Sequence, residues 1–245
     1  MEYRETKDGS LTLFSKQYNQ SYHSCDDGAL SESLQKHVIP AFTFSNKQEL
    51  YILDICFGLG YNTLATLFFI KENNLNTKVH IFSPELDANL INSLKDFEYP
   101  KSLSEYKNII NSLIETNYYK SDSMEIELFI GDGREYIKNL DVKIDIVYQD
   151  AFSSDVNHEL WTQEYFADIV KLLSNDAIIT TYSIATPVRL AMSENNLNIY
   201  EYQSTVKKRS TIASMVKISD DRLKYIDMEK KKINNPNARA LVDNL

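Results

Sequence analysis

The sequence predicts an α/β domain with a mostly parallel sheet. Apolar runs of strand length alternate with stretches of helical spacing, as expected for successive strand, helix and strand units. One of these runs ends in a glycine-containing segment that leads directly into a predicted helix. The chain has 245 residues, of which 43% are hydrophobic, so it can bury one large core, and we expect one large domain with appendages.

The expected strands and helices alternate along the middle of the chain. The predicted strands cover residues 50–56, 78–82, 126–130, 144–148 and 177–182. The predicted helices cover residues 61–72, 88–94, 134–140 and 162–173. A further helix over 186–193 is predicted because Thr186 suits an N-cap and Pro187 suits the first helical position. Residues 198–203 and 211–218 predict a closing pair of strands.

Segments outside this alternation divide the chain into three predicted parts. Residues 1–45 predict an extension with a hairpin of 11–14 against 17–22, a turn at Asp8-Gly9 and a helix over about 31–38. Residues 46–219 form the main domain, in which residues 96–123 have helical spacing and predict an inserted helix. Residues 220–245 are polar and charged, and we expect a loosely held tail.

Composition narrows the class of protein. No apolar run is long enough to span a membrane and the first residues lack a secretory signal, so a cytoplasmic protein is expected. Cys25 and Cys56 fit no metal-ligand spacing, and no metal site is predicted. The formal net charge of -9 argues against a broad nucleic-acid footprint, although it leaves room for a local one.

The segment Phe57-Gly-Leu-Gly60 predicts a ligand site. It follows a strand and precedes a helix, so bare backbone N–H groups and a positive helix end lie at the carboxyl edge of the sheet, close to Asn62. A glycine pair also serves tight turns for purely conformational reasons. A dinucleotide motif would have a third glycine where Thr63 stands, and Asp54 would be unfavourable beside a pyrophosphate. A cationic or hydroxyl-rich ligand is therefore favoured.

Acidic residues follow the next strands. Glu85, with Leu86 beside it, lies where a carboxylate can accept both hydroxyls of a ribose, and Asp132 can accept from the exocyclic amino group of adenine. Asp150 follows the fourth strand. Each acid alone also fits a turn or a helix cap. Together they favour a ligand with ribose, adenine and a positive centre but no phosphate, which is S-adenosylmethionine.

Several segments, taken in order, resemble the methyltransferase of the MnmC type, which methylates 5-aminomethyl-uridine derivatives at the wobble position of tRNA. The resemblance covers about residues 8–215. It is carried by D-G-S-L-T-L near the start and by the Glu85 strand end, and by segments at 22–33 (Y-H-S-C-D-D-G-A-L-S-E-S), 57–62 (F-G-L-G-Y-N), 131–135 (G-D-G-R-E), 150–152 (D-A-F), 161–166 (W-T-Q-E-Y-F) and 207–210 (K-K-R-S).

The resemblance implies a Rossmann-like class I methyltransferase sheet with a small N-terminal β element and an inserted helical segment. It implies that the segment with Tyr22 and Ser24 helps to close the cofactor site. It also implies that Gly58, Gly60, Glu85 and Asp132 hold S-adenosylmethionine. The full set that we predict to bind the cofactor is Tyr22, Ser24, Asp54, Phe57, Gly58, Gly60, Asn62, Glu85, Leu86, Gly131, Asp132, Gly133 and Asp150. Larger relatives carry a flavin-dependent oxidase domain, for which this chain has no room, so a stand-alone methyltransferase is expected.

Asp150 and Phe152 are the predicted catalytic residues. The resemblance implies that Asp150 faces the methyl group and the substrate amine. We favour orientation of the amine over strong general-base action, because pairing with an ammonium stabilises the wrong protonation state. Phe152, Trp161 and Tyr182 would exclude water or stack on a base, although each also suits a core position. The tRNA backbone would contact Lys207, Lys208 and Arg209.

Two other functions stay open from the residues alone. A spermidine synthase-like aminopropyltransferase uses the same fold, and G-D-G followed by D-A-F-S-S-D resembles its acidic motifs, but Ala151 and Phe152 interrupt the acidic cluster. The second alternative is a non-catalytic tRNA- or protein-binding module that has kept the fold. Loop shape after Phe152 is also open, because relatives often continue this motif with alanine-proline.

Overall fold

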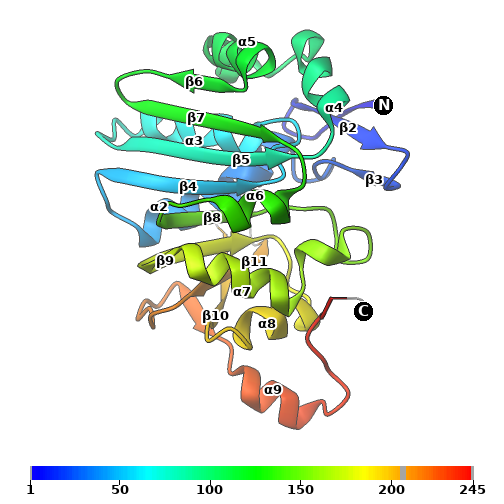
Figure 1. Ribbon diagram of the computed structural model, residues 1–245, viewed down its shortest axis with the longest axis vertical. Helices are drawn as coiled ribbons and strands as arrows, with labels where there is room; N and C mark the ends of the chain where they lie inside the picture. Colours follow the sequence, from blue (N-terminus) through cyan, green and yellow to red (C-terminus); the bar gives the residue numbers. More distant parts are fainter. Residues whose placement is uncertain (1, 205–207, 244–245) are drawn as a thin grey trace.

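The computed structural model describes residues 2–204 and 208–243. These residues form a nine-stranded mixed sheet with helices on both faces, and a separate three-stranded sheet near the N-terminus (Figure 1). The predicted α/β class is confirmed. The division of the chain at residues 45 and 219 stays a prediction.

Parallel strands make up the middle of the large sheet. They are β4 (Glu49–Ile55), β5 (Lys78–Glu85), β7 (Met124–Ile130), β8 (Ile144–Gln149) and β9 (Leu173–Thr181). Their spatial order is β9-β8-β4-β5-β7, with parallel pairing throughout. The chain runs outward from β4 to β7 and then returns to β8 on the other side of β4. Ligands of open α/β sheets bind at the carboxyl ends of strands beside such a change of direction.

Side-chain alternation along the strands builds a core on each face of the sheet. Ile52 packs against α3 (Tyr61–Glu72), whereas its neighbour Leu53 packs in the cluster that contains α6 (Gly133–Asn139), α7 (Gln163–Leu172) and α8 (Thr186–Ser193). Figure 1 shows α6, α7 and α8 in front of the sheet and α3 behind it. The helix predicted at 186–193 is confirmed, but Ala185 is its N-cap and Thr186 its first residue.

The inserted segment 96–123 is helical only in part. It contains the 3₁₀-helix η3 (Lys101–Tyr106), the helix α5 (Lys107–Thr116) and the edge strand β6 (Tyr118–Lys120), which pairs antiparallel with β7. The helices α4 (Ala88–Ser93) and η2 (Leu94–Asp96) precede it. The prediction of helix alone missed β6, because a polar three-residue edge strand has no apolar pattern of its own.

The C-terminal part of the chain is more ordered than predicted. After β10 (Asn198–Gln203) and β11 (Arg209–Ser214), the strand β12 (Leu223–Tyr225) pairs with β10, and the helix α9 (Met228–Asn234) follows. Arg134 then forms a bidentate ion pair with Asp243, at 2.7 and 2.8 Å. The expectation of a loosely held tail was therefore wrong for residues 220–243.

The N-terminal sheet lies beyond the carboxyl ends of β4 and β5 (Figure 1). Its strands are β1 (Glu2–Glu5), β2 (Leu11–Ser15) and β3 (Gln20–Ser21). The Asp8-Gly9 turn joins β1 to β2, so the predicted hairpin is the second of two, and β1 was missed. A helical stretch follows as α1 (Ala29–Ser33), the π-helical η1 (Leu34–Val38) and α2 (Ile39–Phe44), longer than predicted.

No helix within residues 2–204 and 208–243 has both the length and the apolar character needed to cross a membrane.

Candidate functional site

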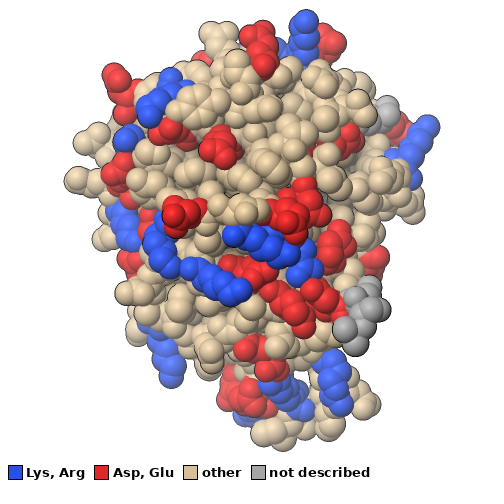
Figure 2. Space-filling model, viewed as in Figure 1, with Lys and Arg blue, Asp and Glu red and all other residues tan. Residues whose placement is uncertain are grey.

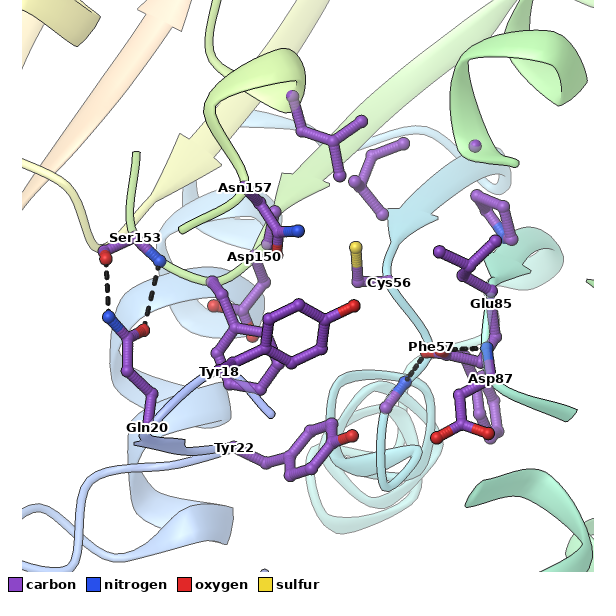
Figure 3. A pocket seen from close by; sticks show the side chains of 18 of the residues that line it. Tyr18, Gln20, Tyr22, Cys56, Phe57, Glu85, Asp87, Asp150, Ser153 and Asn157 are labelled. Atoms are coloured by element: carbon purple, nitrogen blue, oxygen red, sulfur yellow. Dashed lines mark hydrogen bonds between the residues drawn. The ribbon is translucent and has the colours of Figure 1, made fainter. Parts of the chain in front are cut away.

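A pocket of about 270 Å³ lies at the carboxyl ends of β4, β5, β7 and β8. Residues of β3 and of the segment after it close one side of this pocket. Figure 3 shows Gln20 and Ser153 at one end, and Glu85 and Asp87 at the other. The switch in strand order at β4 and the N-terminal sheet thus build the site together.

Most of the predicted site residues line this pocket. Those in its lining are Tyr22, Ser24, Phe57, Gly58, Asn62, Glu85, Leu86, Gly131, Asp132, Gly133, Asp150, Phe152 and Tyr182.

The turn after β4 depends on unusual backbone conformations. Cys56, Gly58 and Gly60 have φ values of 66°, 56° and 75°, which non-glycine residues rarely adopt. A Cβ at Gly60 would also lie 2.8 Å from the ring of Phe57. Glycine at this position therefore has a steric reason, and although Gly60 does not line the pocket, it fixes the start of α3 as its N-cap residue.

Glu85, at the end of β5, connects the strand ends on its side of the pocket. Its Oε2 accepts the N–H of Gly58 at 2.8 Å, and its Oε1 accepts the N–H of Asp87 at 2.9 Å. Burial raises the pKa of Glu85, although these backbone donors oppose the rise. Each carboxylate oxygen has a second lone pair, so the group can still accept hydroxyl donors such as those of a ribose.

Asp132, after β7, is exposed and caps α6. Its Oδ1 accepts the backbone N–H groups of Arg134 and Glu135 at 2.8 and 3.1 Å. Among the described residues, these bonds occupy Oδ1 and leave Oδ2 for another donor. The turn and cap role considered in the sequence is therefore real, and it is compatible with a ligand contact by the second oxygen.

Asp150, just beyond β8, is held by residues of two other segments. Asn62 on α3 donates its Nδ2 to Asp150 Oδ2 at 2.9 Å, and His37 Nε2 lies 3.2 Å from Asp150 Oδ1. Asn62 Oδ1 is buried and has no hydrogen-bond partner among the described residues. The residue Asn62 itself belongs to the pocket lining.

Asp54 lies beneath the pocket and does not line it. Its oxygens accept from Asn62 Nδ2 at 3.3 Å and from Thr63 Oγ1 at 2.9 Å. Burial raises the pKa of Asp54 to about 7, and the charge of Asp150 adds to the rise. Asp54 was predicted to bind the cofactor directly, but the structure connects it to the pocket only through Asn62.

Aromatic rings form one wall of the pocket. Phe152 lies with its ring centre 4.9 Å from those of both Tyr18 and Tyr22. Tyr182 donates its hydroxyl to the Ala151 carbonyl at 2.9 Å. The predicted substrate residue Trp161 is fully buried outside the lining, where its Nε1 donates to the Phe152 carbonyl at 2.7 Å. Trp161 therefore supports Phe152 from behind, and its predicted contact with a base does not follow from its position.

The segment that the resemblance assigns to closing the site carries a buried ionic cluster. Glu32 accepts the N–H of Ser24 at 2.7 Å and pairs with Lys36 at 2.6 Å. Burial alone would raise the pKa of Glu32, but the contacts with His23 and Lys36 hold it well below its usual range. Glu32 and His23 also line the pocket, so this cluster fixes one of its walls.

The predicted basic segment lies beside this cluster rather than in the pocket. Lys208 reaches Asp27 at 2.9 Å, and Arg209 lies 3.7 Å from Glu201, with both basic side chains more than half exposed. Lys207 lies outside the described residues.

Sequence reasoning missed several residues at the pocket. Tyr18, Gln20 and Ser153 line it, and Gln20 Nε2 donates to Ser153 Oγ at 2.6 Å across 133 residues of chain. His37 was also missed. A lone histidine on an apolar helix carries no signal in the sequence, and the long-range Gln20 contact depends on how the N-terminal sheet docks.

The acceptor groups of the pocket match the hydrogen-bond donors and the positive charge of an adenosyl sulfonium, and the described residues form no metal-binding cluster. Carboxylates at three strand ends can accept the ribose and adenine donors, and their negative charge favours a cationic centre. No cluster of histidine, cysteine, aspartate and glutamate that could hold a metal occurs in the part of the chain that the structure describes.

The comparison with protein families agrees with a binding site for S-adenosyl-L-methionine. Residues 98–217 match a family model described as S-adenosyl-L-methionine-dependent methyltransferase. An uncharacterized protein of Methanocaldococcus jannaschii is 32% identical over 209 residues, which is 84% of this chain and 56% of that protein. The bifunctional protein MnmC of Thiobacillus denitrificans, named for tRNA 5-methylaminomethyl-2-thiouridine biosynthesis, is 23% identical over 86% of this chain and 36% of its own length.

The chain thus spans about half the length of the first of these relatives and about a third of the second. Among solved structures, the crystal structure of MnmC2 from Aquifex aeolicus superposes with a TM-score of 0.81 at 30% identity, and the match covers 99% of this chain and 78% of that one. The fold, the acidic strand ends and this match agree. This chain belongs to the family of S-adenosyl-L-methionine-dependent methyltransferases that includes MnmC2.

Proposed function

We propose that this enzyme transfers a methyl group from S-adenosyl-L-methionine to the 5-aminomethyl group of the wobble uridine, or 2-thiouridine, in tRNA. The product would be 5-methylaminomethyl-(2-thio)uridine. Several relatives, at 23 to 27% identity, are named for the biosynthesis of 5-methylaminomethyl-2-thiouridine in tRNA, which supports the proposal. A tRNA substrate also implies a cytoplasmic location.

The position of Asp150 is the observation that carries the proposal. Its carboxylate lies in the pocket lining, at the strand end next to the glycine turn, with one oxygen fixed by Asn62. S-adenosyl-L-methionine supplies an electrophilic methyl group that a neutral amine must approach in line. Asp150 would hold that amine by a hydrogen bond.

The remaining lining residues divide between cofactor and substrate in this proposal. Glu85 would accept the ribose hydroxyls, and the free oxygen of Asp132 would accept from adenine. Tyr22, which lies beside Gly58, would close the cofactor side of the pocket. Tyr18 and Phe152 would stack on the uracil ring, because a base read in a single-stranded loop is commonly splayed out onto aromatic side chains.

The family assignment argues against the aminopropyltransferase alternative. Phe152 also argues against it, because its ring packs against two tyrosines where an acidic site for several ammonium groups would be needed. The non-catalytic alternative predicts tRNA binding without cofactor binding.

Nucleoside mass spectrometry tests the proposal directly. The purified protein is incubated with S-adenosyl-L-methionine and with tRNA that carries 5-aminomethyluridine or its 2-thio form. We expect one added methyl group on this nucleoside. Unchanged tRNA together with spermidine formed from decarboxylated S-adenosyl-L-methionine and putrescine would instead establish the aminopropyltransferase. Binding of tRNA without binding of S-adenosyl-L-methionine in calorimetry would establish a non-catalytic module.

A further inference from the structure

His37 lies behind the pocket in a rare backbone conformation. It is fully buried within the π-helical segment Leu34–Val38, between α1 and α2. Short π-helical segments inside α-helices are rare and occur frequently at functional sites. Core packing alone does not explain why His37 lies in this wider helical turn.

The imidazole of His37 spans the space between β9 and Asp150. Its Nδ1 lies 3.0 Å from the hydroxyl of Thr180, and its ring meets Tyr148 edge-on with centres 5.8 Å apart. Its Nε2 is buried and makes no directed hydrogen bond to any residue within 2–204 or 208–243, and it lies 3.2 Å from Asp150 Oδ1. Burying a polar nitrogen without a hydrogen bond costs free energy. A hydrogen bond to Asp150 that becomes aligned during function would explain why His37 Nε2 is buried here.

The Asp150 carboxylate favours one tautomer of His37. The Thr180 hydroxyl donates to the carbonyl of Val147 at 3.4 Å and lies 3.0 Å from His37 Nδ1, a contact in which either atom can be the donor. His37 Nε2 lies 3.2 Å from a carboxylate oxygen, and only a protonated Nε2 makes that contact attractive, so in a neutral ring Nδ1 is the acceptor. The Nε2 N–H is on the side of the ring nearest to Asp150.

Asp150 would then have a separate donor on each oxygen. Asn62 already donates to Oδ2 at 2.9 Å, and a small rotation of the carboxylate would bring Oδ1 into line with His37 Nε2. Catalytic hydrogen bonds are often poorly aligned before the substrate binds and tighten in the complex. Other titratable groups close to this arrangement are Asp54, which contacts it through Asn62, Tyr148, which is bonded to Thr66, and Cys56 and Tyr182, which interact with the charge of Asp150.

We infer that His37 is a positioning residue that donates from Nε2 to Asp150 and fixes its carboxylate toward the substrate amine. The inference rests on the proposed function, because it assumes that Asp150 receives an amine. A donor on Oδ1, together with Asn62 on Oδ2, would fix the rotation of the carboxylate. Asp150 would therefore orient the amine.

Two-bond ¹H–¹⁵N correlation spectra of the histidine rings test the tautomer without any substrate. The chain has four histidines, and His37→Gln identifies the signal of His37. We expect protonated Nε2 and unprotonated Nδ1 in the native protein, and a changed His37 signal in Asp150→Asn. A proton on Nδ1 with a bare Nε2 would overturn the inference, whatever the substrate proves to be.

Methyl transfer measured on the same variants separates positioning from folding. His37→Gln keeps an amide N–H near the place of Nε2 and should retain kcat within about threefold, whereas His37→Leu should lower kcat by at least tenfold. Both should bind S-adenosyl-L-methionine like the native protein. The matched control is His80→Gln on β5, whose ring pairs with Glu49. Equal loss in both His37 variants, or weaker cofactor binding in His37→Leu, would indicate a structural role and overturn the inference. An inactive native protein would overturn only the proposed function.

Discussion

At the scale of single residues, Asp150 is the group whose removal tests the chemistry most directly. We expect Asp150→Ala to lower the rate of methyl transfer by on the order of 10² or more, the usual effect of losing a positioned catalytic group. The affinity for S-adenosyl-L-methionine should stay the same, because Glu85 and the glycine turn remain. Single-turnover kinetics and calorimetry measure the two quantities.

The matched control for Asp150 is Asp155→Ala, an exposed acid in the same loop. It should transfer methyl groups like the native protein. Native turnover in Asp150→Ala would remove this residue from the mechanism.

Asp54 predicts a pH dependence of stability. Burial raises the pKa of Asp54 from its ordinary value of 3.8 to about 7, so the folded chain binds more protons than the unfolded chain between these values. The contribution of Asp54 to stability is thus fully present below about pH 4 and is lost as the pH rises through 7. The loss is on the order of 4 kcal/mol.

Urea unfolding of the native protein and of Asp54→Asn, at pH values from 4 to 8, measures this dependence. The asparagine side chain of the variant does not titrate. The unfolding free energy of the native protein should therefore fall relative to that of Asp54→Asn as the pH rises. Parallel curves over this range would show that Asp54 has an ordinary pKa.

The sequence pattern predicted the side of the site formed by the strand ends better than the side formed by the N-terminal extension. Glu85, Asp132 and Asp150 could be found because each follows an apolar strand, and parallel strands bring their carboxyl ends to one edge. His37 and Tyr18 could not be found in this way. They belong to an extension whose docking is set by long-range packing, and no periodicity in the sequence encodes it.

At the scale of elements, the contact between β3 and the loop after β8 closes the pocket. Gln20 donates to Ser153 Oγ and accepts the Ser153 N–H at 3.3 Å. We expect Gln20→Ala to weaken S-adenosyl-L-methionine binding about fivefold, because a typical hydrogen bond contributes about 1 kcal/mol. Calorimetry measures the change, with the exposed Gln17→Ala as control. Unchanged affinity in Gln20→Ala would show that closure does not depend on this contact.

The elements predicted from the sequence are those with strong apolar patterns. The helix over 61–72 has the predicted bounds, and the strand over 144–148 extends by a single residue. The missed strands β1, β6 and β12 have three or four residues, and they are stabilised by pairing with longer neighbours rather than by their own composition. The predicted 177–182 strand begins four residues earlier, at Leu173, because α7 runs directly into it.

At the scale of the whole molecule, the charge distribution limits how the proposed tRNA substrate could dock. The net charge is -9, and on the face shown in Figure 2 the Lys and Arg side chains lie among Asp and Glu. A small number of phosphate contacts is therefore expected. Neutralising about three phosphates gives a slope of about −2 to −3 in a plot of log affinity against log salt concentration.

Charge reversal locates these contacts. Lys208→Glu combined with Arg209→Glu should weaken tRNA binding and flatten the salt dependence, while cofactor affinity stays unchanged. Lys230→Glu combined with Lys231→Glu, on α9, is the matched control. If filter-binding titrations show equal tRNA affinity for the first pair and the native protein, tRNA docks on another face.

The Gln20–Ser153 contact joins segments 133 residues apart, and this separation orders the events of biosynthesis. The N-terminal sheet leaves the ribosome first, yet its docking partner emerges only after β8 has been made. Contacts between such distant segments form slowly, since a long loop must be closed before any of them can stabilise the fold. During translation, the strands β4 to β8 are thus made before the nascent chain can close its pocket over the adenosyl group of the cofactor.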